Sequence, residues 1–404
     1  MAGTTIDHIV ALTLLLAALL LFMSLFNQTI QTAILYQSHR SLATECSDLL
    51  DSMLLNPGTP LSTATTTFWG ISNSTPTTFG IQDPEFTEYE VSPFSLMRLD
   101  YSSGSPLYYS MTNMYYSNLT VGFGKSLLVP FNEVVNYSTA AGLLGINGTY
   151  GFSLTITPIL TVNISPVQTT PLNLAVTVTG NGYPIANANV TYCLVNVTCQ
   201  AQYPCYSITS GTSLTNSQGQ AFLSFPGFNG TQTSYALIAY ASSSGLVGEG
   251  DYENILYNGN YPVPLIGDFS SGSLLLANSA DVYGGNPQTI AYNATFVLLD
   301  QDFNLRELPL SNVTGNIKPD TYSNVVIPTN NTGILVVTYE NGPADSGIVL
   351  MPWGVSSLSF PVVFGSAPLA QVWVTTDTRL VTVGGVAYQA KLELWSLQGY
   401  QVVS

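Results

Sequence analysis

The pattern of hydrophobic positions begins with a continuous apolar run. Residues Ile9 to Phe26 read IVALTLLLAALLLFMSLF, eighteen residues without a charge. At 1.5 Å per residue a helix of this length spans about 27 Å, close to the roughly 30 Å hydrocarbon core of a bilayer. The run therefore predicts a membrane-spanning helix.

The helical pattern continues beyond this run. Apolar residues recur at helical spacings as far as Leu54, and no Gly or Pro occurs before Pro57-Gly58. We expect one helix of about 50 residues over 1–55, embedded in the membrane in its first half and amphipathic in its second. The preceding segment MAGTTIDH has no Lys or Arg, and no A-x-A-like cleavage site closes the run. These features predict a retained anchor rather than a cleaved signal.

Residues 56–165 mix short helical and strand patterns. A Thr-rich loop is expected after Pro57-Gly58, and Ser92 with Pro93 predicts the N-terminus of a short helix over 92–99. The other elements expected here are strands within 107–129, a helix over 132–144 that Gly145 ends, and a long strand over 148–165.

The remaining chain is patterned as strands. Short alternating segments separated by Gly, Pro and Asn turns predict a β-sandwich over 166–248. The strand pattern continues over 249–404, which we interpret as a second β-rich module with a C-terminal hairpin. The expected fold class is mainly β with a long N-terminal α-helix.

Charge excludes several functions. The 404 residues carry a formal net charge of −16, and only 7% of them are charged. Nucleic-acid binding needs clustered basic residues, but the seven here are scattered: Arg40, Arg98, Lys125, Arg306, Lys318, Arg379 and Lys391. The two histidines, His8 and His39, flank the apolar run, so imidazole chemistry is excluded downstream. No phosphate-cradling GxxxxGK[ST] and no strand-associated GxGxxG occurs. We expect neither an enzyme nor a cofactor.

Asn-x-Ser/Thr sequons are frequent. Twelve occur, against about six expected from the Asn, Ser and Thr content. The excess indicates an extracytoplasmic location, while polar strand and turn chemistry without glycans accounts for many single sites. The sequons are at Asn27, Asn73, Asn118, Asn136, Asn147, Asn163, Asn189, Asn196, Asn229, Asn293, Asn312 and Asn330.

Three of the four cysteines lie close together in the sequence. Cys193, Cys199 and Cys205 fall within thirteen residues, which favours one disulfide among them, with the pairing left open. They lack the spacing and fourth ligand of a zinc site. Cys46 lies on the stalk helix, where it is either a small buried residue or an intermolecular partner.

Three further groups are candidate binding sites. Asp300, Asp302 and Asn304 have the first spacings of a calcium loop, but Leu305 and Ser311 stand where the loop needs Gly and Glu, so an acidic hairpin turn is favoured. Two other clusters are assigned mainly structural roles. A solvated acidic loop is the interpretation of Asp83, Glu85, Glu88 and Glu90. Packing on a sheet face is the interpretation of Tyr108, Tyr109, Tyr115 and Tyr116.

The chain resembles archaeal pilin-like, or pseudopilin-like, membrane-anchored surface proteins. The resemblance rests on TTIDHIVALTLLLAALLLF running into SDLLDSMLLNPGTP, on the later FWG, FGI and LLGINGTYGFSLTI, and on the closing TRLVTVGGVAYQAKLELW with Gly384-Gly385 as its turn. It covers about residues 1–165 and the last thirty. It implies a long helix that packs with other subunits and a pilin-like α+β head over 56–165.

This sequence departs from the pilin pattern at its N-terminus. Pilins carry a basic residue before a small-residue cleavage site and a Glu five residues into the mature chain, whereas Met1-Ala2-Gly3 has no basic residue. If cleavage follows Ala2, Asp7 takes the position of that Glu and pairs with a neighbouring subunit's terminal amine. The favoured alternative places Asp7 at the aqueous interface as a helix-start residue.

A second resemblance concerns the sandwich segment. GYPIANANVTY and TNSQGQAFLSF are similar to the Ig-like repeat of bacterial and archaeal surface proteins, with a proline-containing turn before one strand and an S-x-G turn before another. This resemblance implies an Ig-like fold over 166–248 and says little about a ligand.

These patterns together predict an extracellular structural or adhesive surface protein, with its N-terminus in the cytoplasm. Its expected partners are membrane lipid, identical or related subunits, and other surface proteins. The alternative is a membrane-tethered module that binds glycan or calcium for a partner enzyme. The helix residues expected to anchor or assemble it are Asp7, Ile9, Leu14, Leu15, Leu19, Leu20, Phe22 and Phe26.

The sparse charge suits an acidic exterior. Few ion pairs can form with seven basic residues, so protonation of the carboxylates would remove much charge without breaking many pairs. We therefore expect the folded part outside the membrane to tolerate acid.

Overall fold

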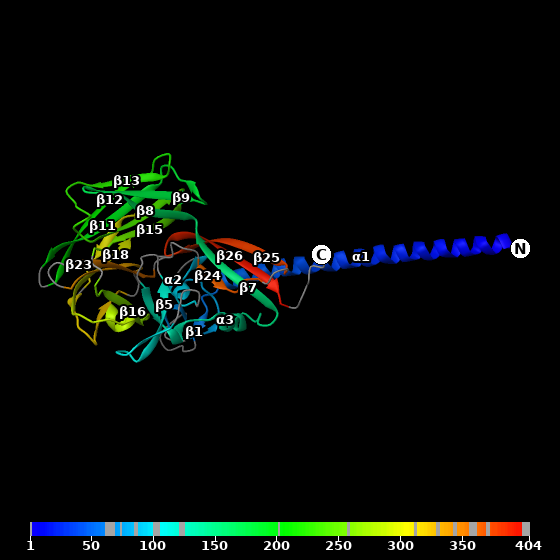
Figure 1. Ribbon diagram of the computed structural model, residues 1–404, viewed down its shortest axis with the longest axis horizontal. Helices are drawn as coiled ribbons and strands as arrows, with labels where there is room; N and C mark the ends of the chain where they lie inside the picture. The colour runs from blue at the N-terminus through cyan, green and yellow to red at the C-terminus, as the bar shows by residue number, and fades with distance from the viewer. Residues whose placement is uncertain are drawn as a thin grey trace.

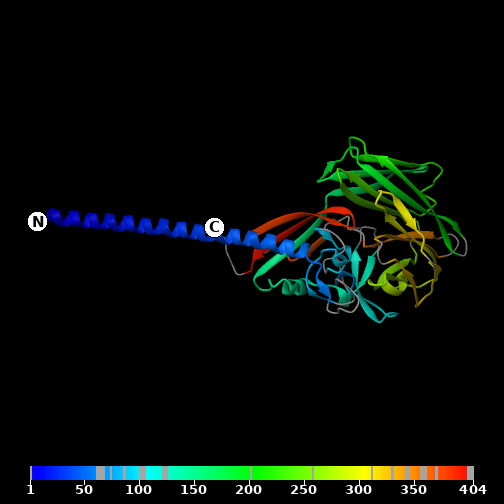
Figure 2. The same ribbon diagram turned by 180° about the vertical axis from the view of Figure 1, so that it is seen from behind.

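The computed structural model describes residues 2–60, 69–72, 75–84, 88–99, 106–120, 126–200, 203–256, 259–310, 313–328, 332–341, 346–354, 362–368 and 372–397. In these residues one long helix projects from a β-rich head (Figures 1 and 2). Strands hold 51% of the described residues and helices 21%, which confirms the mainly β class with a long N-terminal helix.

The long helix, α1, extends over Ala2–Leu54 and is 53 residues long, as the periodicity predicted. Towards its end, one face is buried at helical spacing by Leu42, Cys46, Leu49, Leu50, Met53 and Leu54. The chain turns away at Gly58, whose φ is +69°. A Cβ there would lie 2.5 Å from the ring of Trp69, so this turn requires glycine.

The end of α1 packs on a sheet built from distant segments. Its strand order is β24-β7-β26-β25-β3. β25 and β26 form a hairpin around Gly384 and Gly385, both at positive φ, and β26 pairs along β7. The bounds are β3 Glu90–Val91, β7 Tyr150–Pro158, β24 Val362–Gly365, β25 Val374–Val383 and β26 Val386–Ser396.

A β-sandwich follows in the chain. β7 continues through Ile159 directly into the first strand of the sandwich, β8. One sheet holds β8, β9, β10 and β13, the other has the order β12-β11-β14-β15, and side chains from both share one core. The bounds are β8 Leu160–Thr169, β9 Leu172–Gly180, β10 Tyr183–Pro184, β11 Asn189–Gln200, β12 Pro204–Leu214, β13 Gln220–Phe225, β14 Tyr235–Ser243 and β15 Leu246–Asn254.

Two more sheets complete the head. The first has the order β21-β17-β16-β6-β5-β4, and the second β19-β18-β22-β23, with β20 also on β18. The bounds in the first are β4 Leu107–Tyr109, β5 Met114–Thr120, β6 Ser126–Pro130, β16 Pro262–Asp268, β17 Ser273–Asn278 and β21 Tyr322–Val326. Those in the second are β18 Ile290–Leu299, β19 Leu305–Leu308, β20 Thr314–Ile317, β22 Gly333–Glu340 and β23 Ser346–Trp353.

Strands expected in different segments of the chain share the six-stranded sheet. β6 and β16 pair in parallel through Leu128 and Leu265, which joins the 56–165 segment to the 249–404 segment. The largest hydrophobic core likewise draws on residues from α1 to β26. Alternation identifies the buried face of a strand but not its partner, so the sequence pattern did not reveal this pairing.

Side chains cap the three short α-helices. Ser92 caps α2, Pro93–Met97, as predicted. The helix expected over 132–144 is divided into a 3₁₀ turn, Phe131–Glu133, and α3, Tyr137–Leu143, because Asn136 is extended and caps α3. The other short elements are α4 Ser279–Tyr283, capped by Asn278, the 3₁₀ turn Trp69–Ile71, and the paired strands β1 Thr59–Pro60 and β2 Pro76–Thr78.

A buried cation ties loops to the largest core. Arg98 has no exposed surface. Its Nη1 donates to the carbonyls of Trp69 and Ser72, and its Nε donates to the carbonyl of Glu133 at 2.9 Å. Burial lowers the pKa of Arg98 to about 10, so it stays charged at neutral pH. Burial also raises the pKa of Glu133 to about 7, against the opposing effect of Arg98.

Replacing this cation tests its structural role. Arg98→Met leaves three buried carbonyls without their donor, so we expect a loss of about 3 kcal/mol or more in unfolding free energy. Arg306→Met is the control, since Arg306 is 70% exposed and lies 4.0 Å from Asp300. Thermal unfolding of the full chain in detergent micelles measures both, and equal midpoints for the two variants would contradict the assignment.

Candidate functional site: the apolar helix and its attachment to the head

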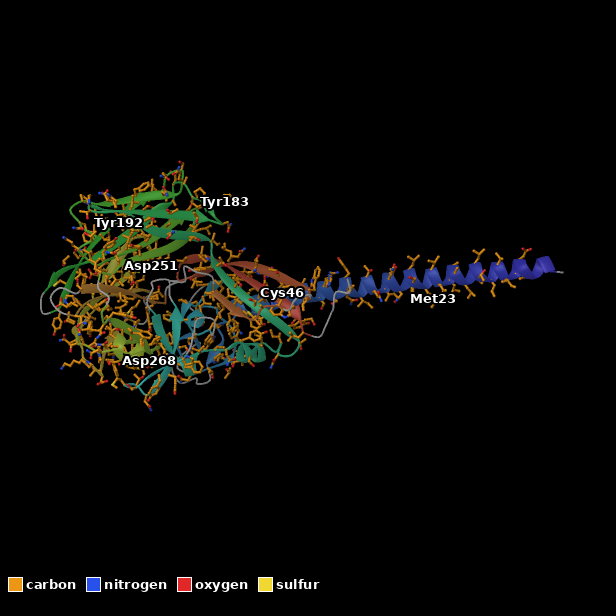
Figure 3. The ribbon with its side chains drawn as sticks, viewed as in Figure 1. Met23, Cys46, Tyr183, Tyr192, Asp251 and Asp268 are labelled. Atoms are coloured by element: carbon orange, nitrogen blue, oxygen red, sulfur yellow. The ribbon has the colours of Figure 1, made fainter. Side chains whose placement is uncertain are left out.

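The first half of α1 is exposed on all sides. The large apolar side chains from Ile9 to Phe26 retain 50–68% of their surface, and Figure 3 shows side chains radiating around the helix near Met23. The hydroxyl of Thr13 donates to the carbonyl of Val10 at 2.9 Å, so this polar group is satisfied within the helix. Such a surface needs an apolar surrounding, which lipid or other helices supply.

The helix meets the tests for a membrane span. It is the one helix in the described residues long and apolar enough to cross a bilayer. The predicted assembly residues Ile9, Leu14, Leu15, Leu19, Leu20, Phe22 and Phe26 all lie on its exposed part, and Asp7 lies at the start of the same stretch. The helix is therefore a candidate membrane anchor.

The second half of α1 is attached to the head. Cys46 is fully buried, with its Sγ 3.5 Å from the carbonyl of Leu392 and 3.8 Å from that of Thr375. Burial, followed by the nearby Asp377, raises the pKa of Cys46 to about 11, which disfavours the reactive thiolate. Cys46 thus fills the seam between the helix and the β25–β26 hairpin.

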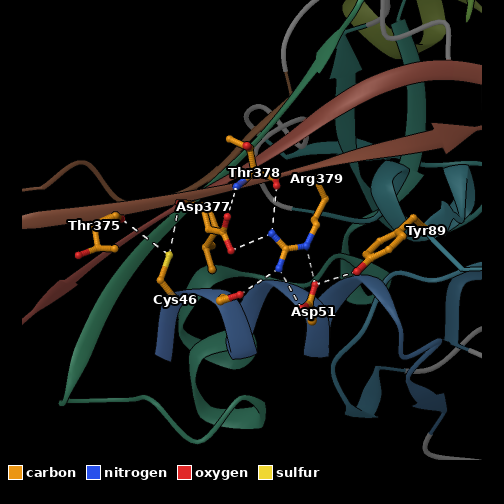
Figure 4. A network of polar contacts seen from close by, with 9 residues as sticks. Cys46, Asp51, Tyr89, Thr375, Asp377, Thr378 and Arg379 are labelled. Carbon is orange, nitrogen blue, oxygen red and sulfur yellow. Dashed lines mark hydrogen bonds and ion pairs between the residues drawn. The ribbon is translucent and has the colours of Figure 1, made fainter. Parts of the chain in front are cut away.

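Beside this seam an ion-pair network joins helix and hairpin (Figure 4). Arg379 on β25 holds Asp51 on α1 by two hydrogen bonds, each 2.9 Å, from Nε and Nη2. Its Nη2 also donates to Ser47 at 2.9 Å, and its Nη1 to Asp377 at 2.8 Å. The Tyr89 hydroxyl donates to Asp51 at 3.2 Å. We call these five residues the clamp.

The electrostatics of the clamp favour its charged form. The hydrogen bonds to Asp51, opposed in part by burial, raise the pKa of Arg379. For Asp377, burial favours the neutral acid, but hydrogen bonds from the Thr378 amide, Ser47 and Arg379 outweigh it and lower the pKa. The paired charges join α1 to β25 beside the apolar seam.

A cavity lies further towards the N-terminus of α1 than the clamp. It has a volume of about 210 Å³ between α1 and the strand ends, and its lining includes Ser38, Ser41 and Tyr150. At its side the rings of His39 and Trp373 stack with centroids 4.0 Å apart. The cavity thus marks where the helix emerges from the head.

The candidate calcium loop is the turn between β18 and β19. The Asp300 carboxylate accepts the amides of Asp302 and Asn304 at 3.0 and 2.8 Å, so it is engaged by its own turn. In the described residues no group of three or more His, Cys, Asp or Glu side chains has metal-site geometry. The geometry is that of an acidic hairpin turn.

The other two clusters are divided by the fold. Tyr109 and Tyr116 are buried, whereas Tyr108 and Tyr115 project from the β4–β5 hairpin with ring centroids 5.1 Å apart. Glu88 is exposed, Asp83 is half-buried, and Glu90 accepts a hydrogen bond from Thr382. Glu85 lies outside the described residues, as does the Thr-rich run expected after Pro57-Gly58.

The cysteines of the sandwich have different environments. Cys205 is disulfide-bonded, and the backbone of Cys199 lies opposite it across the β11–β12 pair. Cys193 is a free, buried thiol, like Cys46. Burial raises the pKa of Cys193 to about 11.

The sequons fall into two groups. Asn27 on α1 and Asn136, Asn147, Asn163 and Asn189 on the head are exposed. By contrast, Asn196 is buried and accepts from Ser207, Asn229 accepts from Thr170 and Thr231, and Asn293 donates to the carbonyl of Pro204 at 3.1 Å. Asn73, Asn312, Asn330 and the side chain of Asn118 lie outside the described residues.

The sequence patterns do not indicate which residues attach the helix to the head. Asp51 and Arg379 are 328 positions apart, and nothing in their local sequence links them. One available signal is the scarcity of basic residues. With seven basic residues in a chain of net charge −16, each basic side chain is expected to pair with a carboxylate.

No protein-family model and no curated protein matches the chain. Among solved structures, human GIVD cytosolic phospholipase A2 with methyl gamma-linolenyl fluorophosphonate aligns at 9% identity over 62% of this chain and 33% of that chain, with a TM-score of 0.11. The C2A and C2B domains of Extended-Synaptotagmin 2 align at 11% identity over 61% and 91%, with a TM-score of 0.09. The chain thus spans about a third of the phospholipase, and TM-scores this low show no shared fold.

A double-mutant cycle tests the clamp. Arg379→Gln and Asp51→Asn each remove one side of a bidentate pair that is partly exposed, so we expect a coupling of about 1 kcal/mol. The pKa of Asp377, which also pairs with Arg379, is lowered, so the contribution of Asp377 is present above the ordinary Asp pKa and is lost as the pH falls through the lowered value. Chemical unfolding at neutral pH measures the coupling, and additive single effects would disprove it.

Proposed function

We propose that this protein is an extracellular structural or adhesive surface protein, held in place by α1 through lipid or through the helices of like subunits. The observation that carries the proposal is the combination of an exposed apolar helix with a head fixed to its far end. Arg379 and Asp51 join the helix to the head by an ion pair at 2.9 Å. A helix attached in this way can hold the head at a distance from the membrane.

The pilin-like and Ig-like interpretations belong to this proposal. In favour of a pilin-like role, α1 packs on a sheet closed by the C-terminal hairpin, and its free half presents apolar residues all round. The sandwich over β8–β15 supports an Ig-like display module on the outer side of the head. In a filament the apolar half packs against neighbouring helices, and in an anchor it stays in lipid.

Calcium binding is not part of this proposal, since Asp300 is occupied by its own turn. The exposed Tyr108–Tyr115 pair leaves carbohydrate binding as a second candidate, because two adjacent aromatic faces suit a sugar.

Charges placed in the apolar run test the anchoring. Leu15→Arg with Leu19→Arg introduces two charges near the middle of the span, each costing about 3 kcal/mol. We expect the variant to leave the membrane fraction after an alkaline wash. Tyr36→Arg, at a 71% exposed position beyond the run, is the control and stays in that fraction. Retention of the double variant would count against anchoring by this helix.

Electron microscopy of sheared surface material separates the two forms of the proposal. Filaments that contain the protein support assembly, whereas recovery of the wild-type protein only in membranes supports the single anchor. Recovery in neither fraction would contradict both forms.

Glycan occupancy tests the extracytoplasmic location. We expect glycans on the exposed Asn136, Asn147, Asn163 and Asn189, and none on Asn196 and Asn293, whose amides are buried or engaged. Mass spectrometry of glycopeptides from the native protein measures each site. Ser165→Ala should abolish modification at Asn163 alone, and four bare exposed sites would argue against this location.

A further inference from the structure

The cavity where α1 emerges from the head, which we call the junction cavity, is lined with hydroxyl groups. They belong to Ser38 and Ser41 on α1, Thr149 and Tyr150 at the turn into β7, and Ser396 at the end of β26. None of the described residues that line it is Asp, Glu, Lys or Arg. Its volume of about 210 Å³ is below the roughly 300–1,000 Å³ of pockets that hold drug-sized ligands. The cavity therefore suits one small, neutral unit that is rich in hydrogen-bonding groups.

An indole ring forms one side of the junction cavity. Trp373 keeps 45% of its surface exposed, and His39 stacks on one face of it, with ring centroids 4.0 Å apart and an angle of 8° between the ring planes. The opposite face is left for a ligand. A sugar has both properties that this lining requires, because its hydroxyls donate and accept hydrogen bonds and its C–H face stacks on an aromatic ring.

A glycosylation sequon lies beside this lining. Asn147-Gly148-Thr149 is a sequon, and Thr149 itself lines the junction cavity. Asn147 is exposed, and its side chain makes no hydrogen bond within the described residues. Since Asn147 and Thr149 are two residues apart, their Cα atoms lie within about 7 Å of each other. A glycan on Asn147 therefore starts at the edge of the cavity.

The turn that carries Asn147 is fixed in place. The amides of Thr149 and Tyr150 both donate to the carbonyl of the buried Ile146, at 3.0 and 3.1 Å. The amide of Leu397 donates to the carbonyl of Thr149 at 2.9 Å, which ties the turn to the residue that follows β26. Docking of a sugar from this turn thus costs little ordering of the backbone.

Phospholipid headgroups do not reach the junction cavity. When the apolar run from Ile9 to Phe26 spans the hydrocarbon core, the helix rises by twelve residues, or about 18 Å, between Phe26 and Ser38. The headgroup layer adds only about 5–8 Å to each side of the core. The headgroups therefore end about 10 Å short of the cavity, whereas a glycan on Asn147 lies beside it.

We propose that the glycan on Asn147 folds back into the junction cavity, where its first sugars stack on Trp373 and form hydrogen bonds with the hydroxyls of α1 and of the turn into β7. The docked sugars cover the opening between the helix and the head. This inference rests on the proposed extracytoplasmic location, because it requires that Asn147 is glycosylated.

Fluorescence quenching of the native full chain in detergent micelles tests the docking. The other three tryptophans, Trp69, Trp353 and Trp395, have at most 2% of their surface exposed. The emission that acrylamide quenches therefore comes from Trp373. Asn147→Gln removes the glycan and leaves the cavity lining intact. We expect its quenching constant to be at least about twofold that of the wild type, because the indole loses its cover. An unchanged constant overturns the proposal.

Asn163→Gln is the matched control, since it removes a glycan from β8 of the sandwich and leaves Asn147 in place. It should keep the wild-type quenching constant, and a rise equal to that of Asn147→Gln overturns the proposal. The full chain produced without N-glycosylation carries no substitution, so it covers the case in which Asn147→Gln does not fold. Its quenching constant should show the same rise, and a constant equal to that of the glycosylated chain overturns the proposal.

Mass spectrometry of glycopeptides separates the failure of this inference from the failure of the proposed function. A bare Asn147 beside glycosylated Asn136, Asn163 and Asn189 overturns the docking alone. Four bare sites contradict the extracytoplasmic location, and the docking with it. A glycosylated Asn147 with an unchanged quenching constant in Asn147→Gln overturns the docking and leaves the location supported.

Discussion

The architecture depends on the packing of the end of α1 against the β25–β26 hairpin. This contact joins an N-terminal segment to a C-terminal one and buries Leu50, Met53 and Leu54 with side chains of the sheet that contains β7, β25 and β26. Hydrophobic burial is non-directional, whereas the bidentate pair of Arg379 and Asp51 has a defined geometry and adds a specific contact to this seam.

The carboxylates of the protein work in two opposite environments. Asp377 is surrounded by donors and is stabilised as an anion, whereas Asp251 is buried among like charges and is stabilised as an acid. The contribution of Asp377 is lost as the pH falls through its lowered pKa, whereas that of Asp251 is lost as the pH rises through its raised pKa.

Local signals in the sequence predicted local structure well. The periodicity up to Leu54 identified α1, Ser92 and Pro93 identified the start of α2, and Gly384-Gly385 marked the last turn. These features depend on residues close in sequence. The pairing of β6 with β16 depends on contacts between distant segments, which no local pattern encodes.

The same distinction explains what was missed at the sites. The alternation in LVGEGDYEN identifies an acidic face on β15, but only the three-dimensional arrangement shows that this strand contacts β23 and β26. Asp51 and Arg379 likewise became partners only through the packing of α1 on β25.

The clamp also has a consequence for how the protein is made. Asp51 and Arg379 are separated by 328 positions, so at about 5–20 residues per second the ribosome needs roughly 15–65 seconds to complete the pair. During this time the buried face of α1 has no hairpin to cover it, while its apolar half is already available to the membrane. The head therefore closes last, and a chain halted before the hairpin leaves a hydrophobic seam open to chaperones and proteases.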